Sequence, residues 1–275
     1  MIITHLSPTT LGQIDRCPYQ HYLYRTLGPK PPGWKLTLGR NVDEARNTTL
    51  IRKSESDGEL PPEDEIKDLM SDLTERAFDA PLNLTDAPLE GDEKQLKGTL
   101  KDESISYALF DRVHFLHNLF PLIVEDNPAV QLKVELEIPN YPVTFLGYMD
   151  CVDNEVRPVD LKTTGRQYIP PTEAEDSMQL IFYDFLLRGI GMTPPGSELQ
   201  FIWKKAKWNE PRDERRIARA RTDTDLNWLL QRIDIALEQL EKEIYPPAIH
   251  FSNPWWCSEK FCGYWNDCKY ARRGK

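Results

Sequence analysis

The sequence predicts an α/β protein in which a mixed central sheet is flanked by helices. Residues 131–138 (QLKVELEI) alternate strictly between apolar and polar side chains, which is the pattern of a half-buried strand. Two further strands are expected at 143–152 and 156–163, and another two at 198–205 and 214–221. A helical stretch lies between these two pairs, and this order of elements is typical of a sheet with helices packed on it.

The remaining elements are predominantly helical. A capped helix is expected over 7–28, where Ser7 or Thr9 can cap and Pro8 suits a first turn. Further helices are expected at 36–53, 62–79, about 93–124, 172–189 and 223–243. We therefore expect one domain made of N-terminal helices (1–53), an acidic helical insertion (54–128), a sheet-and-helix core (129–243) and an irregular tail rich in proline, aromatic residues and cysteine (244–275).

Composition limits the classes of protein that the sequence can represent. The chain has 275 residues, of which 40% are apolar and 28% charged, as is ordinary for a soluble domain. It contains no run of about 18 apolar residues, and its N-terminus lacks the charged and apolar regions of a signal peptide. We expect no membrane partner and a cytoplasmic location, in the host cytoplasm if the protein is viral.

Charge is unevenly distributed along the chain. The net charge is −10, but residues 54–103 alone carry a net charge of −11. Residues 203–221 hold 8 Lys/Arg against 3 Asp/Glu, and the last seven residues add four cations. Because the local field steers a charged ligand, the acidic total does not exclude a DNA partner. The DNA-contacting candidates in the basic stretch are Lys204, Lys205, Lys207, Arg215 and Arg216. The alternative is a solvated charged surface.

Carboxylates and a lysine gather in the second strand pair. Asp160 and Lys162 are two residues apart on one strand, so they point to the same face, and Asp150 near the end of the preceding strand can reach that face. Like charges at close range destabilise one another, whereas a divalent cation reverses that cost. Phosphodiester hydrolysis and a simple salt bridge at a strand end both account for this spacing.

The next helix adds two polar residues to the pattern. Gln179 and Tyr183 are four apart and share a helix face. In order, GYMD (147–150), PVDLKTT (158–164) and QLIFY (179–183) resemble the G-x-x-D, D-x-K-T and Q-x-x-x-Y motifs of the PD-(D/E)XK nuclease superfamily, specifically its RecB-like branch. The resemblance implies a restriction-endonuclease-like core with Mg²⁺ or Mn²⁺ as cofactor.

The resemblance also implies roles for single residues. Asp150, Asp160 and the carbonyl of Leu161 would be metal ligands, Lys162 would position the attacking water, and Gln179 with Tyr183 would form the active-site helix pair. The family often has a metal-binding histidine in a G-x-x-V-H setting, where LGRNVDEA (38–45) has Asp43. Asp43 is therefore a candidate ligand, since carboxylate suits Mg²⁺ or Mn²⁺, with Glu44 as the nearby substitute. The alternative is that this position has lost its role.

Four cysteines form a second candidate metal site. Cys257, Cys262 and Cys268 are spaced C-x4-C-x5-C, and Cys17 can supply a fourth thiolate if the termini meet. RecB-like nucleases often hold a [4Fe–4S] cluster with one N-terminal and three C-terminal cysteines, so the resemblance implies an iron–sulfur cluster here. Zinc is the competing metal, and plain buried cysteines are a third interpretation. Cys151 is expected on the core face of its strand.

Other residues carry less information. The five histidines show no zinc-hydrolase spacing, and no phosphate-binding glycine loop is present. Glu135 is a secondary site candidate on the preceding strand. Tryptophans between the cations, such as Trp203 and Trp208, could stack bases or simply fill a core.

The sequence thus predicts a metal-dependent DNA nuclease, in the first instance an exonuclease acting in recombination, repair or phage DNA processing. Two alternatives remain. One is a CRISPR-associated nuclease that trims spacer precursors. The other is a non-catalytic DNA-binding or partner-regulating module, with the acidic insertion as a protein-binding surface. Oligomeric state is not readable from the sequence.

Overall fold

The computed structural model describes residues 3–84, 87, 91–203, 212–248, 256–259 and 261–271. The chain divides into two compact units. The terminal unit comprises residues 1–30, 134–147 and 222–275, and the central unit comprises residues 31–133 and 148–221. Each unit is described by itself.

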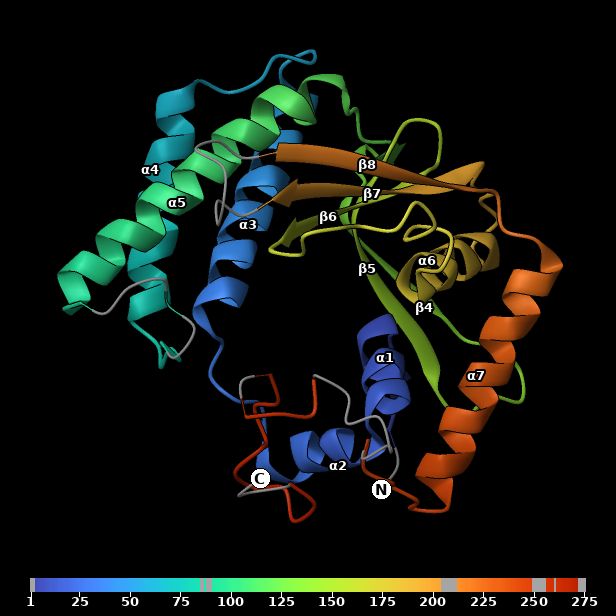
Figure 1. Cartoon of the computed structure of the whole chain (residues 1–275). Helices are drawn as coiled ribbons and strands as arrows, with labels where there is room; N and C mark the ends of the chain where they lie inside the picture. The colour runs from blue at the N-terminus through green and yellow to red at the C-terminus, as the bar shows by residue number, and fades with distance from the viewer. Residues whose placement is uncertain are drawn as a thin grey trace. The chain divides into compact units, whose positions relative to one another are not determined.

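The described helices follow the chain from both ends (Figure 1). They are α1 (Pro8–Arg16), α2 (Pro18–Leu27), α3 (Trp34–Glu55), α4 (Glu63–Phe78), α5 (Glu93–His114), a 3₁₀ turn η1 (Leu116–Asn118), α6 (Met178–Gly189) and α7 (Asp223–Glu241). In the described part of the chain, no helix has the length and apolar character needed to cross a membrane.

A mixed sheet of six strands is the centre of the fold. Its strands are β1 (His5–Leu6), β4 (Val130–Leu136), β5 (Thr144–Val152), β6 (Pro158–Thr164), β7 (Gly196–Trp203) and β8 (Arg212–Arg219). Their order is β1-β5-β6-β7-β8, and β4 also pairs with β5. The β6–β7 pair is parallel, whereas β5–β6 and β7–β8 are antiparallel. A separate small hairpin joins β2 (Ile123–Val124) to β3 (Asn127–Pro128). This architecture confirms the predicted fold class.

Helix α3 covers one face of the sheet in the central unit. Leu38 and Val42 of α3 are buried in one apolar cluster with Leu161 of β6 and Ile202 of β7. Because side chains alternate along a strand, Asp160 and Lys162 of β6 point to the opposite face. That face is covered by α6, which contacts β6 and β7. The alternation along β6 therefore separates an apolar core from a polar site.

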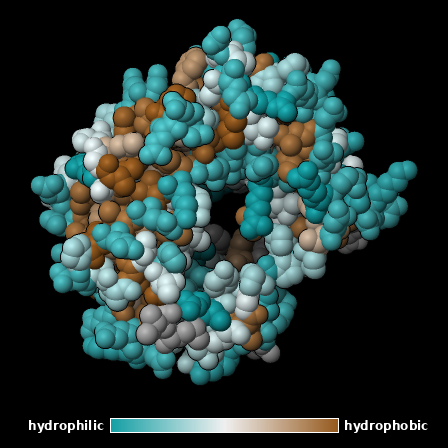
Figure 2. Space-filling model, turned by 180° about the vertical axis from the view of Figure 1, so that it is seen from behind, coloured by the Kyte–Doolittle hydropathy of each residue, from teal (hydrophilic) through white to brown (hydrophobic). Residues whose placement is uncertain are grey.

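Helices α4 and α5 add a further layer beside α3. Ile66 and Met70 of α4 pack with Ala45 of α3 and Ala108 of α5. The acidic residues of α4 lie on its other side and are exposed, among them Glu63, Asp64, Glu65, Asp68 and Asp72. Hydrophilic residues accordingly cover the right-hand edge of Figure 2, where these two helices lie. The acidic segment thus folds as an amphipathic helical layer.

The helix expected over 7–28 is wrong as a single helix. Ser7 caps it as predicted, with its Oγ accepting a hydrogen bond from the Thr10 N–H at 3.2 Å. The helix then stops at Cys17, whose backbone is extended (φ −161°, ψ 95°), because Pro18 has no N–H to continue the ladder. Cys17 begins α2 instead, and its Sγ accepts from the Gln20 N–H at 3.4 Å.

The long helix expected to reach residue 124 is also wrong, since α5 ends at His114. The buried ammonium of Lys53 donates to the carbonyls of Leu116, His117 and Leu119 at 2.8 to 3.1 Å. These bonds satisfy carbonyl groups that follow the helix, and Pro121 disfavours helix at the residue before it. In the same way, α6 begins at Met178 rather than at residue 172, after the two prolines at 170 and 171.

Candidate active site

Strands β5 and β6 separate where the predicted acidic residues lie. Their antiparallel ladder pairs Cys151 with Val159 and Val152 with Pro158. One step further along, the Leu161 N–H donates to Asp150 Oδ2 at 3.2 Å instead of to a backbone carbonyl. The Asp150 carboxylate therefore takes the place of a strand acceptor at the fork. Its other oxygen accepts a weaker bond from Gln131 of β4 at 3.4 Å.

Asp160 and Lys162 form an ion pair on the α6 face of the sheet. Lys162 Nζ lies 2.7 Å from Asp160 Oδ2, and the Asp160 side chain is only 1% exposed. Lys162 Nζ also donates to Gln179 Oε1 at 3.1 Å, while Gln179 Nε2 donates to Asp160 Oδ1 at 2.8 Å. Gln179 of α6 thus bridges the two β6 side chains.

Tyr183 lies one helical turn beyond Gln179 and belongs to the same network. Gln179 Nε2 donates to the Tyr183 hydroxyl oxygen at 2.8 Å. The Tyr183 hydroxyl donates in turn to the Tyr148 carbonyl of β5 at 2.6 Å. Burial, reinforced by the negative charge of Asp160, raises the pKa of Tyr183 well above its usual value. The Tyr183 hydroxyl therefore stays protonated and ties α6 to β5.

Asp43 of α3 approaches the same carboxylates from another element. Burial raises the pKa of Asp43 to about 6, where the nearby charge of Asp160 adds to burial and that of Arg46 opposes it. Burial, followed by the charges of Asp160 and Asp43, raises the pKa of Asp150 well above its usual value. The mutual influence places all three carboxyl groups in one electrostatic cluster. The adjacent Glu44 is exposed, so Asp43 rather than Glu44 faces the cluster.

Gly39 allows α3 to come this close to β6. A Cβ added at Gly39 would lie 3.1 Å from Thr163 Oγ1, which is tighter than ordinary contact. The glycine stands one helical turn before Asp43, so the close approach positions that carboxyl group.

A buried arginine beside Asp43 was missed by the sequence reasoning. Arg46 is 1% exposed, donates to Asp111 Oδ1 of α5 at 2.9 Å and also donates to Gln200 Oε1 of β7. It holds α3 against α5 and the sheet. One signal could have revealed it, since Arg46 lies midway between Val42 and Leu50 on the apolar stripe of α3.

Comparison with known proteins gives this arrangement a family. Residues 5–269 match the family model described as the PD-(D/E)XK nuclease superfamily. The chain belongs to this superfamily. Membership implies a nuclease that acts on DNA, usually with Mg²⁺ or Mn²⁺.

The other two comparisons add little to this assignment. A solved structure titled "Crystal structure of SSO0001" is similar at 12% sequence identity and a TM-score of 0.45, over 98% of this chain and 88% of that one. No curated protein matches the sequence.

The donor set of this nuclease fits a hard divalent cation. Carboxylate oxygens are the ligands that Mg²⁺ prefers, and Asp43 Oδ1 is buried with no hydrogen-bond partner among the described residues. As they stand, no three Asp, Glu, His or Cys side chains in the described ranges meet the geometry of a metal site. Asp150 and Asp160 instead use oxygens on the Leu161 N–H, Gln179 and Lys162.

The four predicted cysteines lie together in the terminal unit. Burial raises the pKa of the Cys262 thiol, and the neighbouring Cys17, Cys257 and Cys268 thiols add to this rise against a hydrogen bond from the Tyr264 backbone. All four are half-buried free thiols. Cys151, by contrast, is fully buried in an apolar cluster of the central unit, as expected for a core residue.

The predicted DNA-contacting cations divide into two groups. Lys204, Lys205 and Lys207 lie outside the described residues, as does Trp208. Arg215 donates to the His114 carbonyl, and Arg216 donates to the carbonyls of Ile169 and Pro170. Both arginines therefore make intramolecular contacts that the basic composition of the segment did not reveal.

Other sequence-singled residues lie elsewhere. Trp203 is 7% exposed and donates its indole N–H to the Arg166 carbonyl, so it is a core residue. Glu135 is exposed in the terminal unit.

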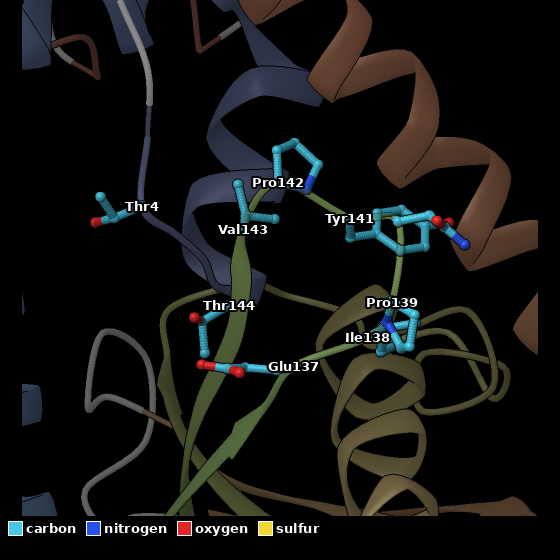
Figure 3. Close-up of a pocket in the computed structure, with 9 residues that line it drawn as sticks. Thr4, Glu137, Ile138, Pro139, Tyr141, Pro142, Val143 and Thr144 are labelled. Carbon is cyan, nitrogen blue, oxygen red and sulfur yellow. The ribbon is translucent and has the colours of Figure 1, made fainter.

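A separate cavity of about 620 Å³ lies in the terminal unit (Figure 3). It is lined by Thr4 and residues 137–144, and Tyr141 beside it donates to Asp234 of α7 at 2.9 Å. Burial and the Asp234 carboxylate raise the pKa of Tyr141 to about 12. Its only acidic lining residue is Glu137, so the cavity lacks the paired acids that hydrolysis requires.

Proposed function

We propose that this chain is a Mg²⁺- or Mn²⁺-dependent deoxyribonuclease that acts as an exonuclease. The proposal is carried by one observation, which is the convergence of Asp43, Asp150 and Asp160 with Lys162 at the fork between β5 and β6. Its biological setting would be DNA recombination, repair or phage DNA processing.

Asp43, Asp150, Asp160 and the carbonyl of Leu161 would hold the cation. When bound, the cation supplies charge neutralisation at the scissile phosphate and a nucleophilic water at neutral pH. The buried Asp43 oxygen without a partner supports this assignment, since an unpaired buried acceptor is costly unless it is used.

Lys162 acts as a proton donor and a positive charge, and not as a general base. Burial lowers the pKa of Lys162, but the charge of Asp160 and its hydrogen bond outweigh burial, so the pKa is raised overall. The side chain is 42% exposed, so the ammonium group can also reach substrate. A protonated Lys162 orients the attacking water and stabilises negative charge that develops on the phosphate.

Gln179 and Tyr183 are positioning residues in this scheme. Gln179 fixes Asp160 and Lys162 relative to each other, and the Tyr183 hydroxyl is engaged with Gln179 and the Tyr148 carbonyl. Neither has to exchange a proton. Together they hold the carboxylate and the ammonium group in the geometry that hydrolysis needs.

Cleavage of end-labelled linear DNA, with circular DNA as comparison, tests the proposal. In Mg²⁺ or Mn²⁺ we expect the wild type to shorten linear DNA from its ends and to leave circles intact. Lys162→Ala should lower the rate by about 10²–10³-fold, the cost of removing one pre-organised charge. The matched control is Lys94→Ala, which removes an exposed lysine at the start of α5. Salt-sensitive DNA binding with no metal-dependent cleavage would overturn the enzymatic assignment.

We also propose that Cys17, Cys257, Cys262 and Cys268 hold a [4Fe–4S] cluster, which would place the chain in the RecB-like branch. The clustering of the four thiols supports a shared ligand, and zinc is the competing occupant. Anaerobic purification followed by iron, sulfide and zinc analysis and a visible spectrum decides between them. Stoichiometric zinc without iron would overturn the cluster.

A further inference from the structure

A cavity of about 440 Å³ opens beside the proposed catalytic lysine in the central unit. Its lining residues are Lys162, Thr163, Thr164, Arg166, Glu173, Asp176, Ser177, Leu199 and Phe201. The volume lies in the range of small-ligand sites. No role assigned above uses this cavity.

The floor of the cavity and the catalytic residues share one face of the sheet. In the parallel β6–β7 ladder, Asp160 pairs with Leu199 and Lys162 pairs with Phe201. Paired residues in adjacent strands point to the same side. A group seated on the apolar floor of Leu199 and Phe201 therefore lies next to the ammonium group of Lys162.

The wall of the cavity is pre-formed, although segment 165–177 has no helix or strand. Trp203 Nε1 donates to the Arg166 carbonyl. Arg216 donates to the carbonyls of Ile169 and Pro170 at 3.0 Å each. Arg221 donates to two carbonyls further along the segment, at 2.7 Å each. Side chains from the sheet and its end thus hold the segment in place, so a ligand would not have to order it.

Charge in the cavity disfavours a phosphate group as the occupant. Lys162 is paired with Asp160, and Arg166 is paired with Glu173. The lining cations are therefore neutralised within the protein, and Asp176 adds a further negative charge. An apolar floor with hydroxyl, guanidinium and carboxylate groups at the rim suits a flat aromatic ring with a polar edge.

We propose that this cavity is a nucleobase pocket that receives one unpaired base of the DNA strand next to the bond being cut. This inference rests on the proposed function, and it makes that function specific for single-stranded or frayed ends. Asp176 lines the rim, is exposed and has no side-chain hydrogen bond within the described part of the chain. A carboxylate there accepts from an exocyclic amino group, so cytosine and adenine are favoured over thymine.

An abasic scan tests the pocket directly. One abasic residue is moved position by position through a short single-stranded oligonucleotide, and the cleavage rate in Mn²⁺ is measured for each. We expect one position beside the cut bond where loss of the base slows cleavage roughly tenfold, as for loss of a stacked base. Equal rates at all positions in an oligonucleotide that is cut normally would overturn the pocket but not the nuclease.

Binding gives a readout that does not depend on cleavage. Affinity for the same oligonucleotides is measured by fluorescence anisotropy in EDTA. The base-dependent step should appear there as well. If it appears without cleavage in any metal, the pocket stands and the proposed function fails.

Two variants locate the effect in this cavity. Thr164→Trp fills the space, so the intact oligonucleotide should bind as weakly as the abasic one, while Thr224→Trp on the exposed start of α7 serves as the control. Asp176→Asn should reduce the preference for cytosine over thymine and leave cleavage of a thymine substrate unchanged. Preserved base dependence in a folded Thr164→Trp variant would contradict the assignment.

Discussion

The acidic centre of the central unit and the cysteine group of the terminal unit are organised in different ways. Asp150, Asp160 and Asp43 come from two strands and a helix, and regular structure fixes each of them. Three of the four cysteines lie in the irregular segment 256–271 and are only half-buried. The acidic centre is positioned by the fold before any metal binds. The cysteine segment has little regular structure to position it, so a bound metal would contribute to its folding energy.

The largest expected effect is on the cysteine group. Cys262→Ser should abolish bound iron and lower the stability of the terminal unit, because the binding energy of a structural metal, on the order of 10 kcal/mol in small metal-folded domains, is folding energy. Metal analysis and thermal unfolding measure both effects.

Cys151→Ala is the matched control. It should keep the full metal content and lose only some packing energy, since Cys151 lies in the apolar core. Equal metal content in wild type and Cys262→Ser would remove the contrast between the two centres.

The second effect concerns the support of the acidic centre. Arg46→Met leaves Asp111 buried without its partner, so the free energy of unfolding should fall by about 3–5 kcal/mol. Arg52→Met on the same helix breaks an exposed ion pair with Glu65 and should cost less than about 1 kcal/mol. Chemical denaturation measures both. Equal losses in the two variants would show that Arg46 does not pre-organise the centre.

The third effect is a pH dependence of metal binding. Because the pKa of Asp43 is raised to about 6, the group is protonated below that pH and must lose its proton to act as a ligand. The Mn²⁺ affinity, measured by calorimetry, should therefore fall as pH drops below about 6, by up to about tenfold per pH unit. An affinity that stays constant through this range would remove Asp43 from the ligand set.

The sign of the effect on metal-free stability is the opposite. A carboxyl group whose folded pKa exceeds its unfolded pKa stabilises the protein at low pH, and this contribution is lost as pH rises through about 6.

The smallest effect compares two adjacent acids. Asp43→Asn removes a charge that Asp160 and Asp150 repel, so in EDTA at neutral pH it should raise the free energy of unfolding by about 1–2 kcal/mol after solvent screening. The same variant should lose the stabilisation that Mn²⁺ gives the wild type. Glu44→Gln changes an exposed neighbour and should do neither. Thermal unfolding with and without metal measures both, and identical behaviour of the two variants would contradict the assignment.

Local pattern predicted much of the fold and much of the acidic centre. Alternation along 131–138 and along β6 depends only on neighbouring residues, and so does the spacing of Gln179 and Tyr183 on one helix face. The helices predicted over 7–28 and to residue 124 were wrong because Pro18 and the ammonium group of Lys53 intervene. The partner of Lys53 lies more than sixty residues away and leaves no trace in a local pattern.

The sequence by itself determined which carboxylates, amine and thiols are present and which of them share a strand or helix face, because side-chain direction follows the backbone period. Only the tertiary structure decided that Asp43 and not Glu44 faces the carboxylates, that Arg46 supports α3 from within the core, and that Arg216 holds the wall of a cavity instead of lying free on the surface. Each of these outcomes depends on contacts between elements far apart in the chain, and those contacts are set by packing and by the pairing of buried polar groups.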